Sequence, residues 1–150
     1  MKKILFIACI TLVCVVPANA QQYEYKIVTS VESIVPAGLG RSRLVAASED
    51  RNYKDYTTSR SEEDNERNKS DRSDIRIKSF DETKLLNFYN LGGIRFQNIA
   101  ANDAVISSKV NAMAQEGWEL AFVVSAVESD AGEKDGNGIF INRYIFRKPK

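Results

Sequence analysis

Alternating residue types mark the first strong element of the chain. Between residues 22 and 31, every second position carries an aromatic or β-branched side chain: Tyr23, Tyr25, Ile27, Thr29 and Val31. This period predicts a strand. The following Pro36 to Gly40 contains proline and glycines, which favour a turn, so we expect the strand to end before it.

A helical pattern precedes the C-terminal part of the chain. Asn102 or Asp103 can accept hydrogen bonds from the free amides of a helix start. The next apolar residues recur at three- and four-residue spacing: Val105, Ile106, Val110, Met113 and Ala114. We expect Gly117 to end the helix in the left-handed conformation of a C-terminal cap, and Trp118 to fold back over it as a large apolar contact.

Two further strands are predicted after the helix. Residues 119–127 carry apolar side chains on both faces, which suggests a central strand. One face has Leu120, Phe122, Val124 and Ala126, and the other has Ala121, Val123 and Val127. In residues 139–147, Phe140, Tyr144 and Phe146 share one face, and the glycine-rich residues 129–138 between the two strands predict a turn.

The middle of the chain is dominated by charge. Residues 49–74 contain nine acidic and six basic residues but only two apolar ones, Tyr53 and Tyr56. Such a segment predicts a mobile, solvated loop, whose flanks at 42–47 and 75–80 pair as a hairpin. Residues 80–101 are ambiguous: Asp81 could cap a short helix that runs through Asn90 and stops at Gly92 and Gly93, while residues 94–99 alternate like a strand.

These elements predict an α+β fold, with a small antiparallel sheet, one main helix packed on one face and a long charged loop insertion. We expect residues 21–150 to form a single domain with the mobile charged loop at 49–74.

The first twenty residues resemble a secretory signal peptide. A short basic start and thirteen mostly apolar residues, 4–16, precede a cleavage site of the type Ala18-x-Ala20. The apolar run is too short to span a bilayer, so we expect no transmembrane segment after cleavage and a periplasmic or secreted protein. A lipoprotein with Cys14 as the lipidated residue is the alternative.

Cleavage also decides which chemistry is available. It removes both cysteines and two lysines but no acidic residue, so the formal charge changes from +1 to −1. The chain has no histidine, and the mature part has no cysteine, which excludes Ser-His-Asp and Cys-His hydrolases and typical zinc enzymes. The balanced charge argues against nucleic-acid binding. We therefore expect no enzyme, no catalytic residues, no metal site and no cofactor.

Three segments could still carry a site. Arg41 and Arg43 beside Gly38 and Gly40 could contact an anion, although a plain turn with solvated arginines explains them as well. Glu116 and Glu119 could act as paired carboxylates, or as surface charges. Residues 130–138 resemble a calcium loop in composition but lack its alternating acidic ligands, which favours a hairpin loop.

Three other stretches carry a resemblance: 23–28 (Tyr-Glu-Tyr-Lys-Ile-Val), 111–120 with Glu-Gly-Trp-Glu-Leu at its end, and 144–149. Together they resemble a family of small bacterial domains of unknown function, here in an exported Gram-negative form with an insertion at 32–100. The resemblance implies a strand, helix, strand, strand fold and an envelope location, and it implies no activity.

The sequence thus favours a non-enzymatic binding or assembly protein of the bacterial envelope, with an unknown protein partner or a second copy of itself. Aromatic residues on the terminal strands that the core leaves exposed would mark the contact surface. The alternative is a protein that binds a small ligand or anion, or an unrecognised enzyme, in which Arg41, Arg43 and Arg95 surround a polar substrate with Asn98 and a carboxylate.

Overall fold

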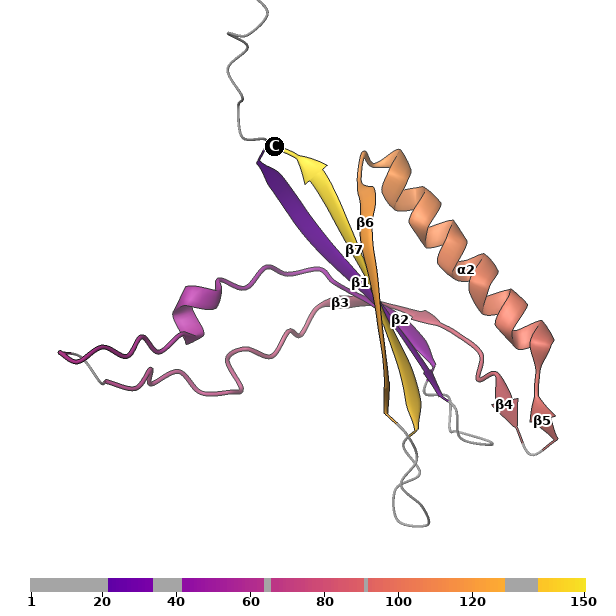
Figure 1. The fold of residues 1–150 in the computed structure, drawn as a ribbon, viewed down its shortest axis with the longest axis horizontal. Helices are drawn as coiled ribbons and strands as arrows, with labels where there is room; N and C mark the ends of the chain where they lie inside the picture. The colour runs from indigo at the N-terminus through magenta and orange to yellow at the C-terminus, as the bar shows by residue number, and fades with distance from the viewer. Residues whose placement is uncertain (1–21, 34–41, 64–65, 91, 129–137) are drawn as a thin grey trace, which may run out of the picture.

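A computed structural model describes residues 22–33, 42–63, 66–90, 92–128 and 138–150. Five of its strands form one antiparallel sheet in the order β3-β2-β1-β7-β6 (Figure 1). Their bounds are β1 Tyr23–Ser33, β2 Arg43–Ala47, β3 Phe80–Lys84, β6 Glu119–Glu128 and β7 Ile139–Pro149. A small hairpin of β4 (Tyr89–Asn90) and β5 (Gly93–Ile94) leads into the helix α2 (Phe96–Gln115).

The two longest strands form the middle of the sheet. β1 and β7 pair along their whole length, from Tyr23 opposite Pro149 to Ser33 opposite Ile139. Because successive side chains of a strand point to opposite faces, this register decides which residues share a face. Val28 and Phe146 lie on the face toward the helix, and Ile27 and Ile145 lie on the other.

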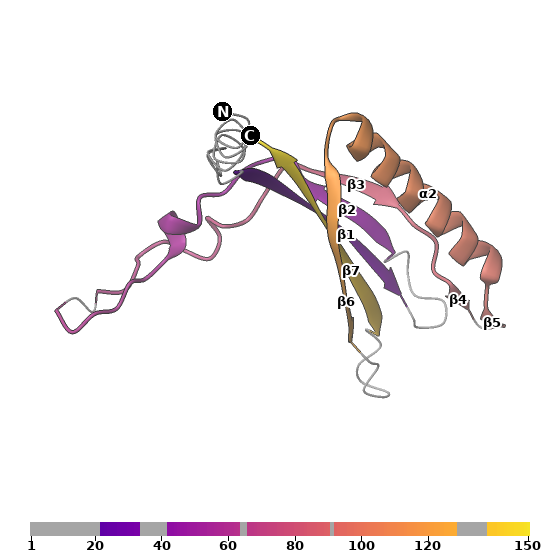
Figure 2. The ribbon, with the colours of Figure 1, turned by 45° about the horizontal axis from the view of Figure 1, so that its top comes forward.

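Helix α2 covers one face of the sheet (Figure 2). The buried apolar core joins the sheet to this helix: Val28, Leu44, Leu85, Met113, Trp118 and Phe146. The predicted helix residues Val105, Ile106 and Val110 pack against this core. One antiparallel sheet with one helical layer is the α+β architecture predicted from the sequence.

The helix begins earlier than the sequence predicted. Residues 96–101 are helical, so the expected strand over 94–99 is wrong. A short helix capped by Asp81 is also wrong, because residues 80–84 form β3. Asn102 does not cap the helix but lies buried within it, where its side chain bonds to the backbone of Leu86 in the preceding segment.

Gly117 ends the helix as expected, with φ at 86°. The amide of Gly117 donates to the carbonyl of Ala114 at 2.9 Å, and the amide of Trp118 donates to the carbonyl of Met113 at 3.0 Å. These two bonds form a Schellman cap, which satisfies carbonyls that the helix end leaves free.

We expect Gly117→Ala to lower the free energy of unfolding by about 1–2 kcal/mol, because a Cβ penalises the left-handed conformation. The new Cβ would lie 3.4 Å from Cε of Lys148, an ordinary contact, so backbone strain would dominate the loss. Urea unfolding measures it. Gly117→Asn is the matched control, because asparagine tolerates this conformation better, and an equal loss in both variants would contradict the explanation.

Trp118 is buried beneath two lysines, Lys26 of β1 and Lys148 of β7. Nζ of Lys26 lies 4.8 Å from the centroid of the Trp118 ring, and Nζ of Lys148 lies 5.8 Å from it. Lys148 also donates to the carbonyl of Glu116 at 2.9 Å. The helix exit is therefore held against β1 and β7, and the three sequence stretches 23–28, 111–120 and 144–149 meet in space.

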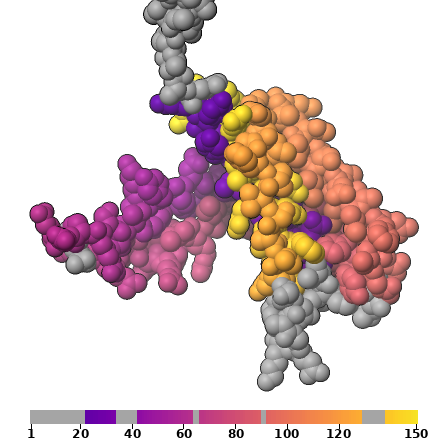
Figure 3. Space-filling view, in the orientation of Figure 1, coloured from indigo at the N-terminus to yellow at the C-terminus, as the bar shows by residue number. Residues whose placement is uncertain are grey.

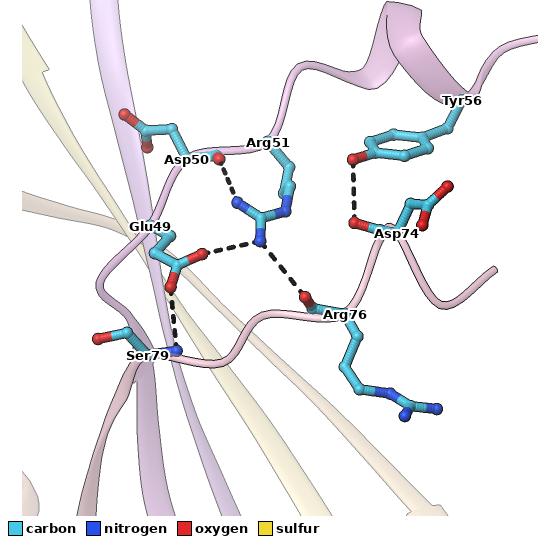
Figure 4. A network of polar contacts seen from close by, with 7 residues as sticks. All are labelled: Glu49, Asp50, Arg51, Tyr56, Asp74, Arg76 and Ser79. Carbon is cyan, nitrogen blue, oxygen red and sulfur yellow. Dashed lines mark hydrogen bonds and ion pairs between the residues drawn. The ribbon is translucent and has the colours of Figure 1, made fainter. Parts of the chain in front are cut away.

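A long excursion connects β2 to β3 (Figure 1). The flanks pair as a hairpin, as predicted, but the second strand is Phe80–Lys84 rather than 75–80. Near the sheet, polar contacts join the segment that leaves β2 to the segment that leads into β3; we call these two segments the limbs of the excursion (Figure 4). Nη2 of Arg51 lies 2.7 Å from Oε2 of Glu49 and 3.3 Å from the carbonyl oxygen of Arg76. The amide of Ser79 donates to Oε1 of Glu49 at 3.1 Å.

The limbs also meet farther out, where the Tyr56 hydroxyl donates to the carbonyl of Asp74 at 3.2 Å (Figure 4). Tyr56 ends a 3₁₀ turn, η1 (Tyr53–Tyr56). The described part of 49–74 thus has local order from polar contacts and buries no apolar core of its own. That the segment is mobile stays a prediction.

The last prediction that the structure corrects concerns β6. Within this chain β6 is an edge strand, because it pairs with β7 alone among the described residues. An irregularity between Leu120 and Phe122 shifts the register, so that Leu120 lies on the helix side with Val123 and Val127. The predicted grouping of Leu120 with Phe122 on one face is therefore wrong.

Candidate functional site

The face of the sheet opposite α2 is uncovered by any other described element (Figure 2). We call it the open face. Strand alternation and register place apolar side chains from all five strands on it: Tyr23, Tyr25, Ile27, Val31, Val45, Ala47, Phe80, Phe122, Val124, Ala126, Ile139, Ile141 and Ile145. The row Tyr23, Tyr25, Ile27, Thr29 and Val31 does share one face of β1, as predicted, and this face is the open one.

The large side chains of the open face are well exposed. Tyr25 is 57% exposed, Ile27 51%, Phe80 50% and Phe122 62%. Isolated exposed apolar residues are common in proteins, but a contiguous patch across five strands is rare in soluble monomers and typically marks a contact surface. The open face is therefore the strongest candidate site in the part of the chain that the structure describes.

A shallow apolar hollow of about 360 Å³ lies at the β3 end of this face. Its floor comes from β1 and β2, and Ile77 and Phe80 form its side. The lining residues are Ile27, Thr29, Val45, Ala46, Ala47, Ile77 and Phe80. Such a hollow fits one or two apolar side chains of a partner, which is how anchor residues bind at protein interfaces.

An ion pair between β6 and β7 lies near one end of the open face. Nε and Nη2 of Arg147 on β7 lie 2.9 and 3.0 Å from the two carboxylate oxygens of Glu119 on β6. The guanidinium also stacks over Tyr23, 4.8 Å from the ring centroid. The hydrogen bonds from Arg147 hold the pKa of the Glu119 carboxyl below its usual range, and the same contact raises the pKa of Arg147.

Titration of Glu119 tests this geometry. Because its pKa is lowered on folding, the carboxylate contributes stability above the unfolded-state pKa, and this contribution is lost as the pH falls through the folded-state pKa. We expect Arg147→Gln to bring the Glu119 pKa back toward its usual range, as followed by NMR of the side-chain carboxyl. Arg143→Gln, on the same face of β7, is the control and should leave the pKa depressed.

The structure describes only one of the two arginines of the predicted anion site. Arg41 lies outside the described residues. Arg43 lies at the start of β2, where its Nε is 2.8 Å from Oε1 of Glu82 on β3 and its Nη1 donates to the carbonyl of Ser42 at 2.8 Å. An anion at Arg43 would have to compete with the Glu82 carboxylate, so the anion site stays a prediction that this contact does not favour.

The other predicted polar residues do not converge either. Nδ2 of Asn98 donates to the carbonyl of Asn87 at 2.7 Å, and the amide of Arg95 donates to the carbonyl of Phe88. The Asn98 side chain therefore holds the segment before the helix, and Arg95 is an exposed residue at the helix start. Glu119 is paired with Arg147, which leaves no arrangement of two facing carboxylates with Glu116. Residues 129–137 of the calcium-like loop, and Ala18 and Ala20 of the cleavage site, lie outside the described residues.

A second cavity, of about 300 Å³, lies between β1, β2 and the C-terminal half of α2. Its lining includes two lysines and four carboxylates, Lys26, Glu49, Asp50, Asp81, Lys109 and Glu116, together with Tyr25 and Ile27 of β1. Across the described ranges, no cluster of three or more histidine, cysteine or carboxylate side chains is arranged to hold a metal ion. This cavity is an alternative site for a small polar ligand.

Neither a membrane-spanning helix nor a similar protein helps to assign the site. In the described segments, no helix combines the length and apolar character needed to cross a membrane. No protein-family model, curated protein or solved structure matches the chain. The resemblance to the small bacterial domains therefore stays a prediction, and the candidate site depends on the geometry of this chain alone.

The alternation of residue types in β1 predicted that its aromatic and β-branched residues share one face, but not whether that face is buried or exposed. Alternation alone cannot tell which face of a sheet a helix will cover, because both faces of β1 and β6 carry apolar residues. The edge position of β6 was missed because apolar residues on both of its faces predicted a central strand. In β3, the other edge strand, three of the five residues Phe80–Lys84 are charged, as is common in edge strands.

Proposed function

We propose that this chain is a non-enzymatic binding or assembly protein of the bacterial envelope, which acts by contact through the open face of its sheet. The single observation that supports this most strongly is the apolar surface that five strands present opposite α2. The predicted signal peptide supports the location, and the lack of histidine in the whole chain supports a non-enzymatic role.

The energetic argument is that the open face contributes little to folding in its exposed state. Burying apolar surface is favourable by about 25 cal/mol per Å² removed from water, and half-exposed residues have not yet gained this. Tyr25 and Ile27 lie next to each other in the middle of the sheet, beside β7 residues that are also on the open face. A partner that covered them would gain this energy without any change in the fold.

Charge at the ends of the face adds selectivity. Arg147 with Glu119, and Arg43 with Glu82, are paired at opposite ends of the sheet. Arg143 lies between Thr29 and Val124 in the register, is exposed, and has no ion pair among the described residues. A partner with an apolar centre and an acidic group opposite Arg143 fits this face best.

The experiment is affinity capture from the native envelope with the full-length chain carrying a C-terminal tag. The test variant is Tyr25→Ser with Ile27→Ser on the open face. The matched control is Ile94→Ser with Phe96→Ser, which removes comparably exposed apolar side chains, 51% and 76% exposed, on the helix side of the molecule. We expect the control to retain the partner at wild-type stoichiometry and the test variant to lose it at least tenfold.

The thermal midpoint of each variant separates contact from folding. Substitutions of exposed residues change the free energy of unfolding by less than about 1 kcal/mol, so both variants should stay folded. Equal capture by the test variant and the wild type would overturn the proposal.

A further inference from the structure

The free edge of β6 differs from the other edge of the sheet. β3 is five residues long and contains Asp81, Glu82 and Lys84, which are charges of the kind that protect natural edges from pairing. β6 is ten residues long, and its interior from Leu120 to Val127 contains neither a charged residue nor a proline. The unpaired amide and carbonyl groups of β6 are therefore accessible to another strand.

β6 also has the side-chain pattern of an interior strand. Its apolar residues are exposed on both faces: Leu120 is 38% exposed, Phe122 62%, Val123 51%, Val124 51% and Val127 58%. Figure 3 shows β6, in orange, uncovered between α2 and the excursion. Apolar residues on both faces are typical of a strand with neighbours on both sides, whereas the described residues supply only β7.

We propose that β6 pairs in antiparallel orientation with β6 of a second copy of this chain. The inference rests on the proposed function, because it specifies how the assembly forms. A twofold axis perpendicular to the sheet relates the two strands, so both helices lie on the same side. The two open faces then become one continuous apolar surface.

Charge decides in favour of a second copy. Antiparallel self-pairing sets each interior residue of β6 opposite another interior residue of β6 in the second copy, and an uncharged interior brings no like charges into opposition. The acidic residues Glu119 and Glu128 lie at the strand ends, and Glu119 is neutralised by Arg147 of its own chain. Residues 122–128 pair regularly with β7, so the bulge near Leu120 leaves this stretch straight enough to accept a partner.

The symmetry also limits the assembly to two chains. A twofold contact uses the same edge of both copies and closes on itself. The edges left outside are the two β3 strands, whose charges disfavour further pairing. We therefore expect a discrete dimer rather than a fibre.

The test is the molar mass of the protein, expressed as the full-length chain and purified after export, by light scattering over a concentration series. We expect twice the mass of one chain. Val123→Lys places a lysine in the uncharged interior of both paired strands and should weaken the dimer at least tenfold, and Val123→Glu should do the same. Ile94→Lys is the matched control, since Ile94 is equally exposed, at 51%, and remote from β6.

Mixing the two Val123 variants gives the decisive result. The lysine of one paired strand then meets the glutamate of the other, so the lysine and glutamate chains should form a mixed dimer that is tighter than the dimer of either variant alone. A monomeric wild type at millimolar concentration, or a dimer that Val123→Lys leaves intact, would overturn the inference. Either result leaves the proposed function standing, because Tyr25 and Ile27 lie two strands away from this edge.

Discussion

Replacing Phe146 with alanine is expected to lower the free energy of unfolding by about 3–5 kcal/mol, the usual cost of removing a buried phenylalanine. Phe146 is 1% exposed and lies on β7 opposite Lys26 and Leu120, at the centre of the layer that α2 covers. The change would leave a cavity among Val28, Met113 and other core residues that the rigid sheet cannot close.

Equilibrium unfolding in urea measures this loss. Phe122→Ala is the matched control, because Phe122 occupies the neighbouring strand but lies on the open face and is 62% exposed. The control should lose less than about 1 kcal/mol. Equal losses would mean that the open face is covered within the folded chain, which would contradict the assignment of the two faces.

Asn102→Leu is the second large effect, with an expected loss of about 2–4 kcal/mol from unpaired polar groups. Asn102 is buried in α2, and its Oδ1 accepts from the amide of Leu86 at 2.8 Å. Its Nδ2 donates to the carbonyl of Leu86 at 2.7 Å and to Oε2 of Glu32 at 2.8 Å. Leucine has a similar size but can make none of these three bonds.

The adjacent residue provides the control for Asn102. Asp103 lies on the same helix and is exposed, so Asp103→Ala should change stability by less than about 0.5 kcal/mol. Hydrogen exchange of the Leu86 amide gives a local readout, because it should become faster in Asn102→Leu alone. If that amide stays protected in Asn102→Leu, the bond to Oδ1 does not hold the segment in place.

The elements with strong local signals could be predicted from the sequence. The β1 alternation and the glycine cap at Gly117 depend on neighbouring residues only, and the structure confirms both. The helix start could not be placed, because Arg95 provides no side-chain cap and Asn102, which resembles one, is used for a tertiary contact. The period of residues 94–99 was too short to separate strand from helix.

The candidate site depended on information that the sequence does not contain. The aromatic row of β1 was recognised, but the buried apolar residue of this strand proved to be Val28, on the opposite face. The choice of face is set by the long-range register with β7 and by the position of α2. Similarly, the apolar character of both faces of β6 predicted a central strand, and only the strand order shows that β6 lies at the edge of the described sheet.

The most direct test of contact through the open face is site-specific photo-crosslinking in living cells. A photoreactive phenylalanine analogue replaces Ile27 on the open face or, as the control, Phe96 on the helix side. We predict a discrete crosslinked product from position 27 and none from position 96. No product from position 27, or the same product from both positions, would contradict the claim that the open face is the contact surface.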